Sequence, residues 1–164
     1  MNTMEDLSGS PAFRNVCESL AERFPGRMDD WMMEKGELTV IVPRDDIQEV
    51  LRHLKGELGF IALNDMIGLD NMNSTDGRRR FSVLYQLYRF PQPVRIRLRV
   101  DIDEGQDLPS CYYLFRSSDW AEREIYDMFG IVFSGHPDLR RIYMPEDFDG
   151  HPLRKDFPLE GRNG

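Results

Sequence analysis

Hydrophobic and polar residues alternate strictly from Val94 to Ile102, which is the clearest pattern in the chain. Successive side chains of a strand point to opposite faces, so this pattern predicts a strand with one face on a core. The opposite face carries Arg95, Arg97, Arg99 and Asp101. Alternation of this kind is typical of an antiparallel sheet that is covered on one side.

Two other segments repeat apolar residues every three or four positions, which predicts helices packed on that sheet. One covers residues 11–24, and the other covers residues 47–58 with Asp45 or Asp46 as its cap. Shorter patterns predict strands over residues 28–34, 38–42, 60–67 and 80–90. Residues 103–110 are predicted to be a polar loop. This order of elements predicts an α+β fold, a two-layer sandwich with a mainly antiparallel sheet.

A short helix is predicted between Asp119, its capping residue, and Gly130, its terminating glycine. Glu122 lies three positions after Asp119, which is the spacing of a capping box. Arg123 and Asp127 lie four positions apart, which is the spacing of an ion pair on one helix.

The sequence after residue 130 has no repeating period, although it mixes glycines and prolines with large apolar residues. Long connections without secondary structure are found in compact domains mainly where they are functional or docked. We therefore divide the chain into an α+β core domain (1–118), a signature helix (119–130) and an extended docking arm (131–164). We expect the core to fold without the arm.

The net charge of −8 disfavours a protein that binds nucleic acid through its phosphates. Two arginine-rich stretches, residues 78–80 and 95–99, could still follow RNA phosphates. No base-stacking aromatic motif is recognisable beside them, so a solvated or partner-facing strand face is the simpler explanation.

The two cysteines, Cys17 and Cys111, lie far apart, and buried thiols are favoured over a disulfide. Their spacing does not predict a thiolate-held metal or iron–sulfur cluster. The first ten residues lack the apolar region of a secretory signal. No apolar run approaches the ~20 residues of a membrane span, so direct membrane insertion is not expected.

Glu122, Glu124 and Asp127 could form an acid–base cluster, and a free-standing enzyme would use Glu122, Glu124 and His136. Pairing with arginines is favoured, because no nucleophile or phosphate-binding loop accompanies them. His136 and His151 could ligate a metal, but packed loop histidines are the simpler interpretation. The enzyme and an RNA-binding module stay as alternatives that co-purification would separate.

Three motifs near the C-terminus, EREIYDMFGI, GHPDLRRI and GHPLRKDFPL, resemble the C subunit of the proton-pumping NADH:quinone oxidoreductase, respiratory complex I. The resemblance covers about residues 119–160. Charged positions, large aromatics and glycines agree in register over that length. The preceding α+β pattern and the length of the chain are consistent with this family.

The resemblance implies an accessory, peripheral subunit of the hydrophilic arm, on the cytoplasmic side of the inner, energy-transducing membrane. It implies that the complex translocates protons, contains iron–sulfur clusters and uses quinone and NADH, whereas this chain holds no cofactor, metal or catalytic residue. The implied partners are the D subunit, which forms the quinone pocket with the B subunit, and the B and I subunits. The alternative is the equivalent subunit of a ferredoxin-, deazaflavin- or hydrogenase-linked membrane complex.

By position, the family signature and the partner interface would include twelve residues: Glu122, Arg123, Glu124, Asp127, His136, Asp138, Arg140, Arg141, His151, Arg154, Lys155 and Asp156.

Overall fold

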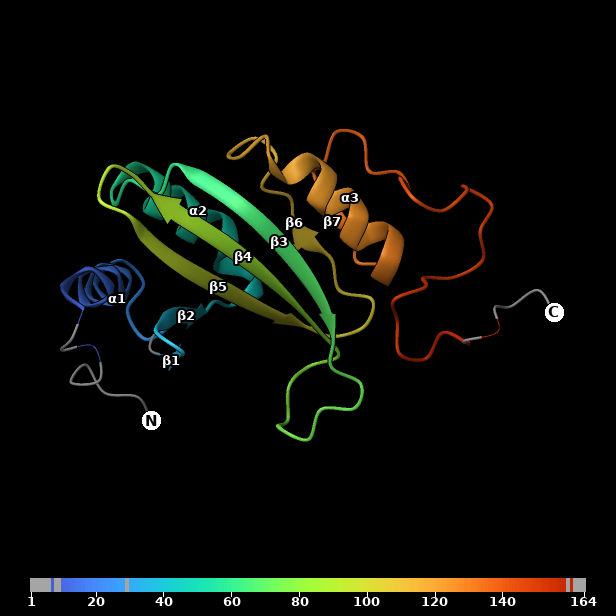
Figure 1. Cartoon of the computed structure of the whole chain (residues 1–164), viewed down its shortest axis with the longest axis horizontal. Coiled ribbons are helices and arrows are strands. Elements are labelled where there is room, and N and C mark those ends of the chain that lie inside the picture. Colours follow the sequence, from blue (N-terminus) through green and yellow to red (C-terminus); the bar gives the residue numbers. More distant parts are fainter. Residues whose placement is uncertain (1–6, 8–9, 29, 159, 161–164) are drawn as a thin grey trace.

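A five-stranded sheet forms the centre of the protein, with the strand order β1-β2-β5-β4-β3 (Figure 1). The computed structural model describes residues 7, 10–28, 30–158 and 160. The strands are β1 (Trp31–Glu34), β2 (Glu37–Ile41), β3 (Ala62–Asp70), β4 (Phe81–Arg89) and β5 (Val94–Ile102). Neighbouring strands are antiparallel except for β2 and β5, which are parallel. The predicted α+β class with a mainly antiparallel sheet is confirmed.

One face of the sheet is the core of the domain. Val40, Leu98 and Tyr85 lie side by side across β2, β5 and β4 and are almost completely buried. On the other face Arg97 pairs with Glu37 at 2.6 Å, and the nearby arginine and aspartate of β5 pair in the same way. The predicted alternation is therefore correct, and the charged face is largely neutralised within the sheet.

Helices α1 (Pro11–Arg23) and α2 (Ile47–Gly56) pack on the buried face. They meet where Ser19 Oγ lies 2.8 Å from His53 Nε2. A short 3-10 turn, η2 (Arg44–Asp46), precedes α2. Asp46 occupies the predicted capping position, but its side chain forms no cap. Its carboxylate instead pairs with Arg27 at 2.6 Å, so the capping prediction is wrong.

The third helix, α3 (Ser118–Phe129), packs against β3. Gly68 permits this approach, because a Cβ atom there would lie 2.8 Å from the ring of Phe129. Gly130 ends the helix at φ +79°, as predicted. The predicted capping box is wrong. Asp119 lies inside the first turn, after the N-cap Ser117, and Glu122 points into the core.

Two very short strands join the core to the segment after α3. Strand β6 (Leu108–Pro109) pairs in parallel with β7 (Phe133–Ser134), so part of the predicted loop at 103–110 is a strand. Ile131 and Phe133 are buried together with the core. The first residues of the predicted arm therefore pack on the domain, while the division of the chain into three parts stays a prediction.

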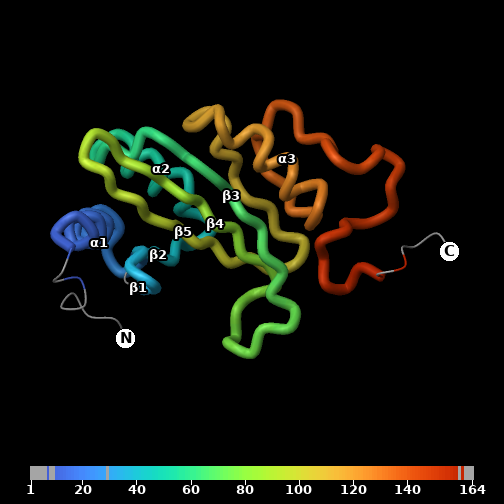
Figure 2. Tube along the Cα trace, in the orientation of Figure 1, coloured from blue at the N-terminus to red at the C-terminus, as the bar shows by residue number. Residues whose placement is uncertain are grey.

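Residues 135–158, named the distal arm below, contain no helix or strand. Figure 2 shows that this segment runs outward beyond α3 and then returns toward the end of β3. Within the described part of the chain, no helix combines the length and the apolar character that a membrane crossing requires.

Candidate functional site: the carboxylate clasps of the distal arm

Asp127 organises the first contact between α3 and the distal arm. It lies in the last turn of the helix and is completely buried. Its Oδ2 atom accepts hydrogen bonds from the backbone N–H groups of Ile142, Tyr143 and Met144 at 3.1, 2.8 and 3.0 Å. Its Oδ1 atom accepts one from Arg141 Nη1 at 2.8 Å. We call Asp127, Arg141 and the three backbone groups the first clasp.

The charge of Asp127 depends on these donors. A carboxylate in the last turn of a helix faces the negative end of the helix dipole, which disfavours it. Burial also acts to raise the pKa of Asp127. The N–H groups of Met144 and Tyr143 and the Arg141 guanidinium outweigh burial and hold that pKa below its usual range. Asp127 is therefore ionised at neutral pH, and charge-assisted hydrogen bonds fix the distal arm to the helix.

Arg141 also closes the distal arm on itself. Its Nη2 atom donates to the carbonyl oxygens of Phe148 and Gly150 at 3.1 and 2.9 Å. Its guanidinium lies 5.8 Å from the centre of the Phe148 ring. One side chain thus connects α3, the start of the distal arm and a turn nine residues later. The observed contacts of Arg141 are all within this chain, and they stabilise the path of the distal arm.

The second half of the distal arm covers the end of α3. His151 Nδ1 lies 2.9 Å from the carbonyl oxygen of Asp127, and the N–H of Leu153 donates to the carbonyl oxygen of Met128 at 3.1 Å. The last carbonyls of a helix have no partner within it, so the arm satisfies them. Gly130 makes room for this contact, because a Cβ atom there would lie 2.7 Å from the His151 ring.

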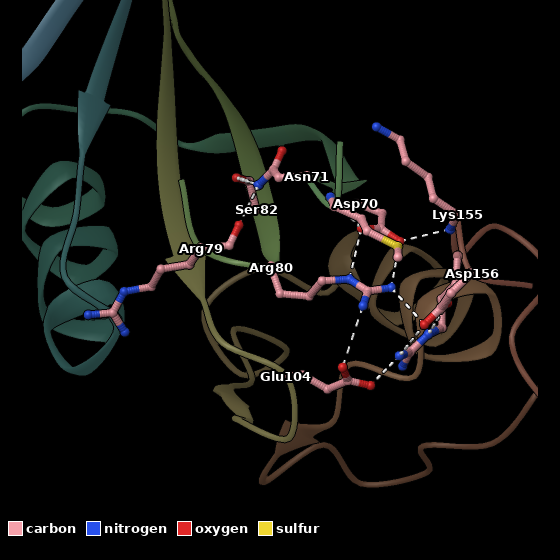
Figure 3. Close-up of polar contacts among 10 residues, drawn as sticks. Asp70, Asn71, Arg79, Arg80, Ser82, Glu104, Lys155 and Asp156 are labelled. Carbon is pink, nitrogen blue, oxygen red and sulfur yellow. Dashed lines mark hydrogen bonds and ion pairs between the residues drawn. The ribbon is translucent and has the colours of Figure 1, made fainter. Parts of the chain in front are cut away.

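A second group of charges holds the far end of the distal arm beside the sheet (Figure 3). Arg80 binds both oxygens of Asp70, at 2.9 and 3.0 Å, and lies 3.1 Å from Asp156. Arg154 lies 3.1 Å from the other oxygen of Asp156 and also pairs with Glu104. We call these five residues the second clasp. It joins the end of β3 and the residue before β4 to a segment about eighty residues later.

The second clasp also lowers the pKa of its two aspartates, Asp70 and Asp156. The Arg154 guanidinium, with Arg80 beside it, lowers the pKa of Asp156 to about 2. Burial acts to raise the pKa of Asp70, but Arg80 and the N–H of Lys155, which donates to Asp70 at 2.8 Å, bring it below its usual value. Both groups are ionised over the neutral pH range, so this clasp is an ion network with two guanidinium groups at its centre.

Glu122 has a different, purely internal role. It is completely buried and accepts hydrogen bonds from Ser110 Oγ at 2.6 Å and from the N–H of Cys111 at 2.8 Å. It therefore ties the segment after β6 to α3. Burial, together with the nearby Glu122, raises the pKa of the Cys111 thiol well above its usual value, and burial raises that of Cys17 to about 12. Both cysteines are free and buried, so their thiols are unreactive at neutral pH.

Ten of the twelve residues of the predicted interface bind other groups of this chain through their side chains: Glu122, Arg123, Asp127, His136, Asp138, Arg140, Arg141, His151, Arg154 and Asp156. Asp138, Arg140 and Asp156 are nevertheless exposed. Glu124 and Lys155 are exposed as well. The predicted ion pair between Arg123 and Asp127 is wrong, because Asp127 binds Arg141 instead.

Three members of the second clasp, Asp70, Arg80 and Glu104, were not predicted. The available signal was weak: an aspartate at the end of a strand and an arginine at the start of the next, separated by a turn-rich loop. No local sequence pattern around Asp70 or Arg80 indicates that they contact Asp156 and Lys155, more than seventy residues later.

The structure does not assemble the alternative catalytic or metal sites. Glu122 is buried, whereas Glu124 is exposed, so they do not form a pair on one surface. His136 is packed against Tyr112 and lies 3.3 Å from Asp119. Within the described residues, no group of three or more histidine, cysteine or acidic side chains is placed to hold a metal ion.

Comparison with known proteins agrees with the resemblance of the three C-terminal motifs, which lie within the region that the family model matches. Residues 40–163 match the model of the family described as respiratory-chain NADH dehydrogenase, 30 Kd subunit. The chain is 44% identical to the C subunit of the NADH-quinone oxidoreductase of Chelativorans sp. over 92% of its length and 74% of that protein. It is 40% identical to the C subunit of Geobacter metallireducens, with 87% of each chain covered.

Two solved structures share the fold. The trypsin-resistant fragment (1–134) of Nqo5 has a TM-score of 0.70 at 36% identity, covering 78% of this chain and 99% of the fragment. A chain of an archaeal membrane-bound sulfane sulfur reductase has a TM-score of 0.73 at 19% identity, covering 90% and 86%, and shows the fold alone. The protein with the two clasps therefore belongs to the family of the 30 kDa subunit of respiratory-chain NADH dehydrogenase, also named the C subunit of NADH-quinone oxidoreductase.

Proposed function

We propose that this chain is an accessory, cofactor-free subunit of the hydrophilic arm of a complex I-type NADH:quinone oxidoreductase. The chain braces the D subunit, which carries the quinone site, and also contacts the B and I subunits. Electron transfer to quinone and proton translocation belong to the assembly, so this chain alone is expected to carry no catalytic residue. The complex contains the iron–sulfur clusters, and this chain lies peripherally on the cytoplasmic side of the energy-transducing membrane.

The observation that supports bracing is the shape of the distal arm. The two clasps hold it in one irregular path, yet Tyr143 and Leu153 point outward and are 61% and 54% exposed. Large apolar side chains held rigidly at a surface are the anchors that protein interfaces use. The names of the relatives, all subunits of NADH-quinone oxidoreductase, favour this complex over a ferredoxin- or hydrogenase-linked one.

The experiment is isolation of the complex from detergent-solubilised membranes through a tag on this chain. We expect the B, D and I subunits to be recovered, with NADH:quinone reductase activity. Tyr143→Ala combined with Leu153→Ala should reduce recovery of the D subunit without unfolding the chain. Phe90→Ala is the matched control, because Phe90 is equally exposed in the turn between β4 and β5, far from the distal arm (Figure 1).

Two results would reject the proposal. The first is a chain that is recovered alone, without any of the three subunits. The second is a Tyr143 and Leu153 double variant that retains the D subunit as well as the Phe90 control does.

A further inference from the structure

The surface at the start of α3 has the composition of a second docking site, separate from the distal arm. Tyr113 and Trp120 are 71% and 66% exposed, the two most exposed large apolar side chains of the described chain. The first lies in the segment before α3 and the second lies in the first turn of the helix. A soluble protein gains nothing from holding two such rings in water, so their exposure indicates a contact surface.

Each ring is accompanied by an arginine. The Arg116 guanidinium lies 4.2 Å from the centre of the Tyr112 ring and 5.6 Å from that of Tyr113. The Arg123 guanidinium lies 5.1 Å from the centre of the Trp120 ring. Stacking restricts these long side chains, so less rotational freedom is lost when they bind a second group.

These two arginines differ from most others in the protein. Within the described residues, neither Arg116 nor Arg123 has a carboxylate partner; Arg123 donates only to the carbonyl oxygen of Arg140, at 3.3 Å. By contrast, the arginines of both clasps, and Arg97 and Arg99 of the sheet face, pair with carboxylates. In a chain of net charge −8, an arginine without such a partner has a vacant bidentate site for a carboxylate.

The two halves of this surface are connected through side-chain contacts. Tyr112 packs on His136, at 5.4 Å between ring centres, and His136 lies 3.3 Å from Asp119, next to Trp120. The two tyrosines are themselves packed edge to face at 5.2 Å. The surface is thus a single built unit rather than scattered exposed residues.

We propose that Tyr113, Arg116, Trp120 and Arg123 form a docking surface for an acidic segment of a neighbouring subunit in the same complex. Two carboxylates of that segment bind the guanidinium groups of Arg116 and Arg123, and an apolar side chain covers the ring of Trp120. This inference rests on the proposed function for the identity of the assembly. It assigns to α3 an interface that is chemically distinct from the apolar anchors of the distal arm.

Acidic residues near Trp120 indicate how the partner segment is oriented on this surface. A cavity of about 220 Å³ beside Trp120 is lined partly by Asp65 and Glu124 and by neither of the two arginines. Acidic residues of the partner would be repelled there. The acidic end of the partner segment therefore lies over Arg116 and Arg123. The whole chain is acidic, which disfavours nucleic acid or an anionic lipid surface as the occupant.

The test uses the assembled complex, isolated through a tag on this chain. Arg116→Glu and Arg123→Glu should each weaken retention of the neighbouring subunit by about tenfold at moderate salt. Arg52→Glu is the matched control for Arg116→Glu, because both side chains are exposed and Arg52 lies on α2, where it pairs only with Glu49 at 3.4 Å. The Arg116 side chain makes no hydrogen bond within the described chain, so its substitution tests the surface even if the Arg123 variant fails to fold.

A crosslinking experiment identifies the occupant. Photo-crosslinking from p-benzoylphenylalanine in place of Tyr113 or Trp120 should capture a peptide of another subunit that contains at least two acidic residues. Crosslinks to a second copy of this chain, to a peptide without acidic residues, or to nothing would overturn the inference. Unchanged retention of both arginine variants would overturn it as well. If the unmodified chain recovers no subunit at all, the proposed function fails instead.

Discussion

The sheet domain and the distal arm are held together by different forces. The domain buries aliphatic and aromatic side chains between one sheet face and its helices, and each buried side chain contributes roughly 1.5–3 kcal/mol. The distal arm buries little apolar surface and depends on two carboxylate clasps. Packing is nearly independent of pH and salt, whereas ion pairs are sensitive to both. The comparison shows how one chain can combine a body held by apolar packing with an irregular arm held in one path by charges.

The largest effect on stability is expected from shortening the chain at two different points, residue 130 and residue 135. Ending it at residue 130 removes Ile131 and Phe133, which belong to the buried core, and leaves β6 unpaired. Loss of these two side chains should cost several kcal/mol in total, since large core deletions cost about 2–5 kcal/mol each. Ending the chain at residue 135 instead removes only the distal arm and should leave a cooperative unfolding transition.

Chemical denaturation of both truncated chains measures the difference in the free energy of unfolding. Equal stability of the two would mean that the whole arm from residue 131 is separate from the core, as the sequence pattern predicted.

The next largest effect is expected for the buried carboxylate of the first clasp. Asp127→Ala leaves Arg141 and three backbone N–H groups without their acceptor. Breaking a buried pair in this way costs about 3–5 kcal/mol, although release of the arm into water limits the loss. We expect the amides of residues 142–144 to exchange with deuterium much faster, while those of β4 stay protected. Unchanged protection at 142–144 would show that something other than Asp127 holds the distal arm.

Arg140 and Arg141 are neighbours of the same residue type, and comparing them separates the effect of an exposed arginine from that of a buried one. The Arg141 side chain is 12% exposed and binds Asp127, whereas the Arg140 side chain is 62% exposed and pairs with Asp138. Arg141→Ala should destabilise the arm by about 2–4 kcal/mol, because Asp127 stays buried without its cation. Arg140→Ala should change stability by less than about 0.5 kcal/mol. Thermal unfolding and deuterium exchange of the isolated chain measure both, and similar losses for the two variants would contradict this assignment.

The local patterns of the sequence predicted the domain well and the charges of the arm poorly. Alternation from Val94 to Ile102 and the helical spacing before Gly56 depend on neighbouring residues, so they identify the strand and the helix directly. The absence of a period after residue 130 likewise predicted an irregular segment, which the structure shows from residue 135 onward after the short strand β7.

The charge partners could not be inferred in this way. Asp127 has Arg123 four positions before it, a spacing that only makes them neighbours on a helix surface. The arm supplies three N–H groups and a second arginine, Arg141, which together bind Asp127 more favourably. Strand β6 was missed for the same reason, since its pairing is decided by residues 133–134, far along the chain.

The smallest effect is expected at the second clasp, where a change of pH tests whether charge or packing holds the end of the distal arm. The pKa of Asp156 is about 2 in the folded protein and about 4 in an unfolded chain, so its contribution is present above about pH 4 and is lost as pH falls toward 2. Asp156 is 38% exposed, and solvent screening limits its contribution to below about 1 kcal/mol.

The readout is exchange of the Lys155 amide, which donates to Asp70, corrected for the intrinsic effect of pH. Asp156→Asn should loosen this amide slightly at pH 6 and remove part of its acid dependence, while amides in β4 are unaffected. High salt should act in the same direction as acid, because it screens the exposed pairs. An amide at Lys155 that keeps its full protection from pH 6 to pH 3 in the unmodified chain would mean that packing, rather than charge, holds this end of the distal arm.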